Sequence, residues 1–314
     1  MAERGIRLIV NPAAGGGTAT RAVPRIRRWL MEQGSTFDVV RTQHPMHAVE
    51  LARRAVAEGY EAVVAVGGDG TANEVLNGLM QAKESAEGDA ALGVLCVGRG
   101  NDFAYGAGIP ADLRMGCRTL LEGNCVSMDI GRVNGPQLSQ ARFFGNGVGI
   151  GFDTVVGLEA AKLKRLRGFA GYFVAALKTI YLYFDAPQVS IRSDDTSYER
   201  QALMVSIMNG RRLGGGFMMA PDASMVDGEL DLCIAQHASR LQVFALIARF
   251  MRGTQARHPA ITMHRTKRVV VTAVQGALPA HADGELLCEE GSQLEIEIVP
   301  QAIQVLCSAS GGRG

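Results

Sequence analysis

The sequence predicts an α/β N-terminal domain with a doubly wound, mostly parallel sheet, followed by a β-rich sandwich or barrel domain with helical insertions. Short apolar runs alternate with helical patterns in the first part of the chain, and short β-like runs separated by turn residues fill the rest. The N-terminal runs lack period-two alternation, as is typical of parallel strands buried on both faces. We place the domains at residues 1–131 and 132–299, and we expect the segment 300–314 to pack back on the first.

The N-terminal strands and helices follow one another in alternation. Predicted strands cover 7–10, 37–40, 62–66 and 92–97, and predicted helices cover 18–33, 45–58 and 71–81. We expect Pro45 to open the second helix and Gly59 to close it, because proline suits the first helical turn and glycine the residue after the last. Parallel sheets with this order bind ligands beyond the carboxyl ends of their strands, so a site is expected in the loops there.

The C-terminal part is predicted to be an antiparallel sandwich or barrel. Its β-like runs cover 126–133, 142–150, 188–191, 203–208, 230–235, 269–274, 294–299 and 303–306. Two helical insertions are expected, around 158–184 and 239–252, since apolar residues recur there at helical spacing.

Composition and charge exclude several classes of protein. The chain has 314 residues with 32 basic and 31 acidic side chains, a formal net charge of +1, so no overall field favours nucleic acid. Its six cysteines form no CxxC pair, and the sequence shows neither a signal peptide nor an apolar run long enough to span a membrane. We therefore expect a cytoplasmic chain with reduced thiols and no nucleic-acid partner.

Glycine is in surplus, and the surplus is clustered. The chain has 39 glycines, where a frequency of about 7% would give roughly 22. Three clusters, at 15–17, 67–70 and 98–100, each follow a predicted parallel strand and precede a helix. In that position backbone N–H groups can approach a phosphate closely. Tight turns are the alternative explanation for any one cluster.

The cluster Gly67-Gly68-Asp69-Gly70-Thr71 is the most informative of the three. Its glycines and the helix start that follows suit a polyphosphate, with Thr71 and Asn73 as further donors. An acid in a phosphate loop implies an intervening cation, so Asp69 indicates Mg²⁺; a helix N-cap or Asx turn is the alternative. No lysine follows the glycines, which excludes a Walker A loop.

Four motifs occur in order along nearly the whole chain: NPAAG at 11–15, GGDGTANE at 67–74, GRGNDFA at 98–104 and ADGE at 282–285. Together they resemble the bacterial diacylglycerol kinase-like lipid kinase family. The resemblance implies an ATP- and Mg²⁺-dependent kinase that transfers the γ-phosphoryl group to the hydroxyl of diacylglycerol or a similar lipid, giving phosphatidic acid or an analogue. Such a transfer needs positioning and neutralised charge, which glycine loops, acids and a metal supply.

The resemblance also implies a role for each motif residue. Asp69 and Asp102 would organise the catalytic Mg²⁺, and Glu285 would act as general base with Asp283 beside it. An Asp-Gly hairpin turn is the alternative for the ADGE motif. The implied nucleotide-binding residues are Asn11, Gly15, Thr42, Gly67, Gly68, Asp69, Gly70, Thr71, Ala72, Asn73 and Arg99. Arg99 stands where many family members have threonine or serine, and both a phosphate contact and a solvent-facing side chain are open for it.

The acidic stretch 221–231 matches the structural Mg²⁺ loop of the same family. There the side chain of Asp227 and the carbonyls of Ser224 and Glu229 would ligate the ion, an oxygen-only set that suits Mg²⁺. An Asp-Gly turn without metal is the alternative.

A lipid acceptor implies contact with a membrane surface. Basic residues at 162–167 precede an aromatic-rich helical stripe that ends at Phe184. This pattern is typical of a helix on an anionic bilayer, and equally of a core helix with solvated basic residues. We expect peripheral association with the inner face of the membrane, and a homodimer is one assembly that the family often forms.

Two other functions stay open. An NAD kinase-like small-molecule kinase would share the GGDGT-type loop, although the NPAAG start and the GNDFA loop argue against it. A non-catalytic nucleotide- or lipid-binding regulator would keep the fold without turnover. Phosphorylation of lipid rather than NAD in one assay separates the three.

Overall fold

The computed structural model describes residues 4–98, 100–162, 174–175, 178–179, 186–194 and 196–308. The chain divides into two compact units: unit 1 comprises Met1–Asp129 and Pro300–Gly314, and unit 2 comprises Ile130–Val299. The expectations for Arg99 and for most of the basic and aromatic stripe at 162–184 lie outside the described residues.

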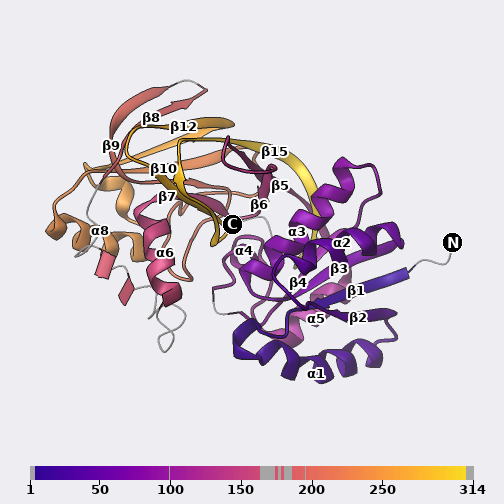
Figure 1. The fold of residues 1–314 in the computed structure, drawn as a ribbon. Helices are drawn as coiled ribbons and strands as arrows, with labels where there is room; N and C mark the ends of the chain where they lie inside the picture. The colour runs from indigo at the N-terminus through magenta and orange to yellow at the C-terminus, as the bar shows by residue number, and fades with distance from the viewer. Residues whose placement is uncertain are drawn as a thin grey trace. The chain divides into compact units, whose positions relative to one another are not determined.

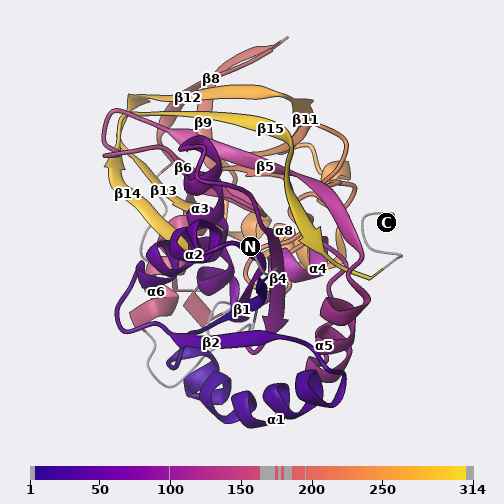
Figure 2. The same ribbon diagram turned by 90° about the vertical axis from the view of Figure 1, so that its right-hand side faces the viewer.

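Unit 1 is a parallel sheet with helices on both faces (Figure 1). Its strands lie in the order β4-β3-β1-β2, all parallel, and the end of β15 (Gln293–Leu306) adds to β4 through Val305 and Leu92. Helices α1 and α5 cover one face, and α2 and α3 cover the other (Figure 2). Its elements are β1 Arg4–Val10, α1 Thr18–Glu32, β2 Phe37–Arg41, α2 His47–Ala57, β3 Tyr60–Gly67, α3 Asp69–Glu84, β4 Ala91–Cys96, α4 Asp102–Gly106 and α5 Leu113–Glu122.

The apolar runs explain this layer arrangement. Strand β3 is buried from Ala62 to its end, as the absence of period-two alternation predicts. Helix α1 buries Ala19, Val23, Ile26 and Leu30 on one face, at helical spacing, and keeps its charged residues outside. The predicted doubly wound α/β layer is therefore confirmed.

Three details of unit 1 differ from the sequence prediction. Helix α2 begins at His47 and not at Pro45, because Met46 at its N-cap has a left-handed φ of 64°. The short helix α4 and the helix α5 were not predicted. The signals for α5 were present, since Asp112 caps it by accepting the Met115 N–H and Gly123 ends it in the left-handed conformation.

Unit 2 is a two-sheet β sandwich with helices on the outer face of one sheet (Figure 1). One sheet runs β14-β13-β7-β9-β10-β11, and the other contains β8, β12, β15, β5 and β6. The long strand β9 belongs to both, since Ser197–Gln201 pairs with β8 and the rest pairs with β7 and β10. The bounds are β5 Cys125–Asn134, β6 Arg142–Phe144, β7 Gly147–Gly151, α6 Phe152–Lys162, β8 Gln188–Ser193, β9 Ser197–Met208, β10 Leu230–Gln236, α8 Arg240–Arg252, β11 Ile261–Thr266, β12 Arg268–Gln275, β13 Leu278–Ala282 and β14 Glu285–Gly291.

Two apolar cores lie on opposite faces of the β9–β10 sheet. Along β9, Val205 and Ile207 join the core between the two sheets, whereas Met204 and Met208 join the core beneath α6 and α8. This period-two alternation of apolar side chains on both faces shows that the sheet is a central layer. The β-rich character of this half is as predicted.

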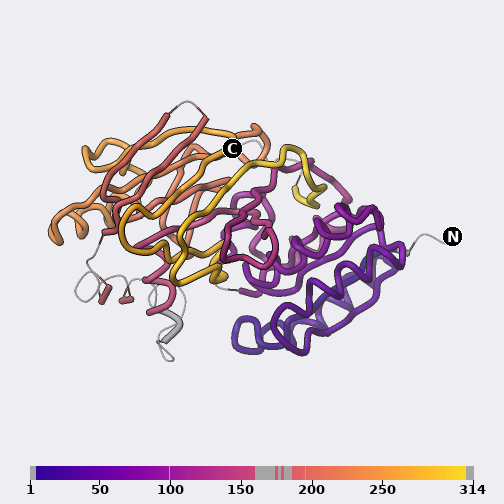
Figure 3. The backbone as a smooth tube through the Cα atoms, turned by 45° about the horizontal axis from the view of Figure 1, so that its top comes forward, coloured from indigo at the N-terminus to yellow at the C-terminus, as the bar shows by residue number. Residues whose placement is uncertain are grey.

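Several boundaries of unit 2 were wrong in the sequence prediction. The predicted strand 142–150 is two strands, β6 and β7, separated at Gly145–Asn146. The predicted strands 294–299 and 303–306 are one strand, β15, which Figure 3 follows in yellow from unit 2 into unit 1. Strands β11, β13 and β14 were not predicted, and the helix expected from about 158 begins at Phe152.

Candidate active site

The loops after β1, β2, β3 and β4 meet at the carboxyl edge of the unit 1 sheet. The strands end at the same level, with Val10 opposite Val66 and Gly67 opposite Cys96. The loop after β2 is held to the end of β1, because the Thr42 N–H donates to the Val10 carbonyl at 2.9 Å. The described nucleotide-binding candidates in these loops, which exclude Arg99, are thus brought together in one part of the fold.

Asn11 and Thr71 join the loop after β1 to the loop after β3. The Asn11 Nδ2 donates to the Thr71 Oγ1 at 3.0 Å, and the Asn11 Oδ1 accepts the Ala13 N–H. Thr71 is buried and packs on Gly67, where an added Cβ would lie 2.3 Å from the Thr71 Oγ1. The hydroxyl of Thr71 therefore fixes the two loops against each other.

Glycine is required where the loops touch. A Cβ on Gly15 would lie 2.3 Å from the Val97 carbonyl oxygen, and a Cβ on Gly98 would lie 2.4 Å from the Gly68 Cα. These distances are far below van der Waals contact, and the atoms met belong to the backbone. Gly15 also has a φ of 60°. The glycine clusters thus permit a close approach of three backbone loops.

Asp69 and Asp102 converge on Gly100. An added Cβ on Gly100 would lie 2.7 Å from the Asp69 Oδ2 and 3.6 Å from the Asp102 Oδ2. Asp69 opens α3, Asp102 opens α4 and is buried, and the Asp69 Oδ1 accepts the Phe103 N–H at 3.2 Å. Asp69 is not the N-cap of its own helix, because Gly68 holds that position; its carboxylate instead accepts an N–H in the first turn of α4. The same contact sets the carboxylate beside Asp102.

The remaining motif residues of α3 make hydrogen bonds that hold this helix in place. Asn73 and Asn77 are buried, and the Asn77 Nδ2 donates to both the backbone carbonyl and the Oδ1 of Asn73, which orients the Asn73 amide. Glu74 accepts the Ala48 N–H at 3.1 Å and so caps α2. Gly68 has no side chain to cap the first-turn N–H groups of α3, and Gly70 and Ala72 lie in that turn.

Asp283 is a buried acceptor for three backbone N–H groups of unit 2. Its Oδ2 accepts the Gly145 N–H at 2.8 Å, and its Oδ1 accepts those of Asn146 and Gly147 at 2.9 Å. Asp283 and Gly284 have φ angles of 49° and 85°, as a two-residue type I′ hairpin requires. The hairpin-turn interpretation of ADGE is therefore realised, and the Asp283 carboxylate holds the loop between β6 and β7.

Glu285 is the first residue of β14, directly after this turn. It pairs with Ala282 across the hairpin and is exposed. The turn thus presents the Glu285 carboxylate at the surface of unit 2, next to a carboxylate that is committed to the backbone.

Asp153 and His281 form a buried pair that the sequence analysis did not identify. The His281 Nε2 lies 3.9 Å from the Asp153 Oδ2, an oxygen that accepts a hydrogen bond from the Ser206 hydroxyl. The His281 Nδ1 accepts the Gly284 N–H at 3.2 Å. Burial raises the pKa of Asp153, and His281 opposes the rise. A Cβ on Gly149 would lie 2.1 Å from the Asp153 Oδ2, so this glycine makes room for the pair.

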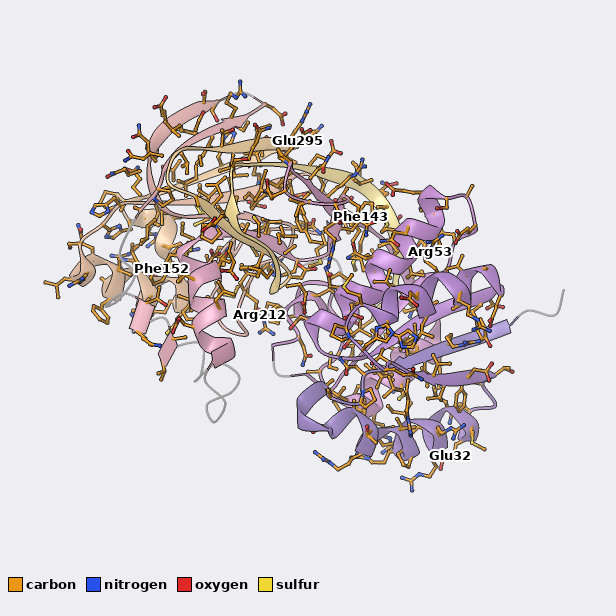
Figure 4. All side chains as sticks on the ribbon, viewed as in Figure 1. Glu32, Arg53, Phe143, Phe152, Arg212 and Glu295 are labelled. Carbon is orange, nitrogen blue, oxygen red and sulfur yellow. The ribbon has the colours of Figure 1, made fainter. Side chains whose placement is uncertain are left out.

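Unit 2 contains a largely apolar cavity that Asp153 helps to line. It encloses about 600 Å³ of atom-free space, its open mouth included, and Asp153 is the one acidic residue among the described lining. The walls come from α6, β9, β10 and α8 and from the loop 213–219, and they include Phe152 at the start of α6 (Figure 4). Apolar walls of this kind are typical of a site for an apolar ligand.

A cation from strand β11, Arg265, lies against the acidic loop 221–231. The Asp227 Oδ1 accepts the Glu229 N–H, and Arg265 lies 3.8 Å from Asp227, 3.6 Å from Glu229 and 3.4 Å from Asp231. Asp231 is the main group that raises the pKa of Arg265. Within the described ranges, no three His, Cys, Asp or Glu side chains gather as a metal-binding group. The metal role of Asp227, Ser224 and Glu229 stays a prediction.

Comparisons with known proteins agree with this architecture. Residues 5–133 match the diacylglycerol kinase catalytic domain, and residues 146–307 match the YegS C-terminal NAD kinase beta sandwich-like domain. Diacylglycerol kinases of Staphylococcus carnosus and Staphylococcus aureus are each 28% identical over 280 residues, which is 89% of this chain and 88% and 85% of theirs.

Solved structures show the same fold at lower identity. A Bacillus anthracis protein assigned as a diacylglycerol kinase superposes with a TM-score of 0.77 at 23% identity, over 99% of both chains. An NAD kinase from Archaeoglobus fulgidus in complex with ATP superposes with a TM-score of 0.52 at 13% identity, over 98% of this chain and 96% of that one. No helix among the described residues is long and apolar enough to cross a membrane. From the two family matches, which together cover most of the chain, it belongs to the diacylglycerol kinase-like family of lipid kinases.

Proposed function

We propose that this lipid kinase transfers the γ-phosphoryl group of ATP, with Mg²⁺, to the hydroxyl of diacylglycerol or a similar lipid, giving phosphatidic acid or an analogue. The names of the staphylococcal relatives support this acceptor class. The observation that carries the proposal is the convergence of glycine loops and two aspartates at one sheet edge of unit 1, where Gly68 touches Gly98 and Asp69 lies beside Asp102.

The loops of unit 1 bind the nucleotide in this proposal. Backbone N–H groups of Gly67–Gly70 and of the first turn of α3 face the phosphates, because that helix start carries the positive end of the helix dipole. Asn11, Gly15 and Thr42 line the rest of the nucleotide site. Asn73 and Thr71, both buried, keep the loops in place.

The donor set around Gly100 fits Mg²⁺. Two carboxylates within a few ångströms of one glycine give a concentration of negative charge, and oxygen ligands are what this ion prefers. When bound there, the ion would neutralise the charge that spreads over the transferred phosphoryl group. Asp69 and Asp102 hold it directly or through water, while Asp69 also keeps its hydrogen bond to α4.

Unit 2 holds the lipid acceptor. The apolar walls of the cavity suit acyl-chain carbon, and Asp153, which is part of the lining, supplies an acidic group for the lipid headgroup. Glu285 takes the proton of the acceptor hydroxyl late in the transfer, and Asp283 fixes the turn that presents Glu285. Asp283 is therefore a positioning residue in this proposal.

A lipid acceptor resides in a bilayer and ATP is a cytoplasmic nucleotide. We accordingly propose that the chain works peripherally at the cytoplasmic face of a membrane.

A lipid kinase assay with matched variants tests the proposal. Asp69→Asn keeps an oxygen acceptor for the Phe103 N–H and should fold, yet it should lose at least about a thousandfold in turnover because metal charge neutralisation is lost. Glu285→Gln should lose about a hundredfold or more, as expected for a removed general base. The matched control is Glu290→Gln on the same strand, an exposed residue that should leave turnover unchanged. Full turnover in Asp69→Asn would refute the assignment.

The NAD kinase-like alternative has one supporting observation, the fold match to the Archaeoglobus fulgidus NAD kinase. Its acceptor is polar, whereas the cavity in unit 2 is lined mainly by apolar side chains. Offering NAD and diacylglycerol in the same assay separates the two, and ATP binding without any product would favour the non-catalytic regulator.

A further inference from the structure

Helix α8 has apolar side chains on two opposite faces. Its inner face, with Val243, Leu246, Ile247 and Phe250, is buried and lines the apolar cavity. Its outer face exposes Leu241, Phe244 and Met251, whose exposed fractions are 82%, 47% and 43%. A helix that faced only water on its outer side would carry polar residues there.

The outer apolar residues form a stripe. One helix face carries exposed apolar residues, each three or four positions from another of the set: Leu241, Phe244, Ala245, Ala248 and Met251. Figure 1 shows α8 at the outside of unit 2, away from the strands that the inner face covers. Exposed apolar stripes of this kind mark interaction surfaces.

The charged side chains of α8 and of the residues that flank it have one sign. Residues 237–260 contain Arg240, Arg249, Arg252 and Arg257 and no aspartate or glutamate. Arg240 and Arg249 fall on either side of the stripe, and Arg252 lies at its C-terminal end. Arginines that border an apolar helix face are the arrangement by which an amphipathic helix lies in an anionic lipid interface.

The ends of α8 are well defined. Ser239 and Gln242 form a capping box, and Gly253 closes the helix in the left-handed conformation. The apolar stripe is therefore presented by a rigid helix of 13 residues and not by a loop.

We propose that the outer face of α8 docks on an anionic bilayer surface, with Leu241 and Phe244 inserted among the lipids and Arg240, Arg249 and Arg252 on the phosphates. This inference rests on the proposed function and extends it to the route of the substrate. The cavity is lined by the opposite face of the same helix, so a bilayer on the outer face lies only about one helix diameter, roughly 10–12 Å, from the cavity wall. A second copy of the chain or a protein partner is less suited, because the arginine border seeks a surface of uniform negative charge.

Vesicle flotation of the full chain tests the docking surface. Phosphatidylcholine vesicles with and without phosphatidylglycerol are mixed with wild type, Leu241→Glu, Phe244→Glu and Arg252→Gln. Each glutamate variant should bind anionic vesicles at least about tenfold more weakly, because an inserted apolar side chain is lost. Arg252→Gln should lose about fivefold on anionic vesicles and nothing on neutral ones. The control is Val274→Glu on β12, which changes an apolar residue with an exposed fraction similar to that of Phe244 and should bind like wild type.

Two readouts separate this inference from the proposed function. The glutamate variants should retain turnover on short-chain diacylglycerol dispersed in detergent while losing it on vesicles. If wild type phosphorylates no lipid but its vesicle binding still depends on Leu241 and Phe244, the proposed function fails and the docking surface stands. Unchanged vesicle binding in both glutamate variants would overturn the docking surface. So would a glutamate variant whose only change is a shift from dimer to monomer in light scattering.

Discussion

The Gly98→Ala variant tests whether the close approach of two loops positions the phosphate site. A Cβ at residue 98 would lie 2.4 Å from the Gly68 Cα and 2.8 Å from the Asn101 Oδ1. Non-bonded carbons rest about 3.5–4.0 Å apart, so the loops after β3 and β4 must separate by about 1 Å. The amide of Asn101 can rotate, but the backbone of Gly68 has no such freedom.

A displacement of this size has a predictable consequence. Misplacing reacting groups by about 1 Å costs on the order of a hundredfold in rate, whereas overpacking costs about 1–3 kcal/mol of stability. We therefore expect Gly98→Ala to unfold cooperatively in urea but to turn over lipid about a hundredfold more slowly at saturating ATP. The control is Gly157→Ala in α6, where an added Cβ meets nothing within 4 Å among the described residues. Turnover of Gly98→Ala within threefold of wild type would refute the reasoning.

Three further predictions concern unit 2. Asp283→Ala leaves three backbone N–H groups without their acceptor. Because each unsatisfied buried group costs about 1–3 kcal/mol, the free energy of unfolding should fall by about 3 kcal/mol or more. A loss below about 1 kcal/mol in a urea titration would contradict this prediction. Ala235→Leu fills part of the cavity and should raise the KM for long-chain diacylglycerol without changing the KM for ATP, and equal changes in both would count against a lipid cavity. Burial raises the pKa of Cys233 from 9.0 to about 12, so the protonated thiol stabilises the fold fully below pH 9 and this contribution is lost as pH rises toward 12. The free energy of unfolding should therefore fall less steeply above pH 9 in Cys233→Ala than in wild type. Parallel profiles of unfolding free energy against pH would refute this prediction.

Local patterns were sufficient for the α/β layer of unit 1. Strands β3 and β4 are apolar runs that covering helices bury on both faces, so the apolar run alone predicts each strand. The glycine loops were also predictable, because glycine follows each strand where the backbone of one loop approaches another, as Gly15 approaches Val97. The roles assigned to these loops stay predictions.

Unit 2 was less predictable because its breaks depend on distant residues. The strand 142–150 is divided where Asp283 binds the N–H groups of Gly145–Gly147, and nothing in the local sequence announces that partner. Strand β15 is the opposite case, an unbroken strand where a break was predicted. Gln301 has a left-handed φ of 49°, yet the strand continues through it because the Gln301 N–H donates to Asp129.

Asp153 was missed for the same reason. In the sequence it follows a glycine-rich strand, and only the pairing of β13 with β7 sets His281 opposite Gly149 and so beside the carboxylate. The available signal was the glycine at every second position of β7, which indicates side chains from elsewhere filling that face.

The phosphorylated product tests the central claim most directly. Purified wild type and Asp69→Asn are incubated with γ-labelled ATP, Mg²⁺, diacylglycerol in mixed micelles and NAD, and the products are separated. A label that appears in phosphatidic acid with wild type, and is absent with Asp69→Asn, is the predicted result. A label in the phosphorylated dinucleotide, or equal labelling of lipid by both proteins, would contradict the account.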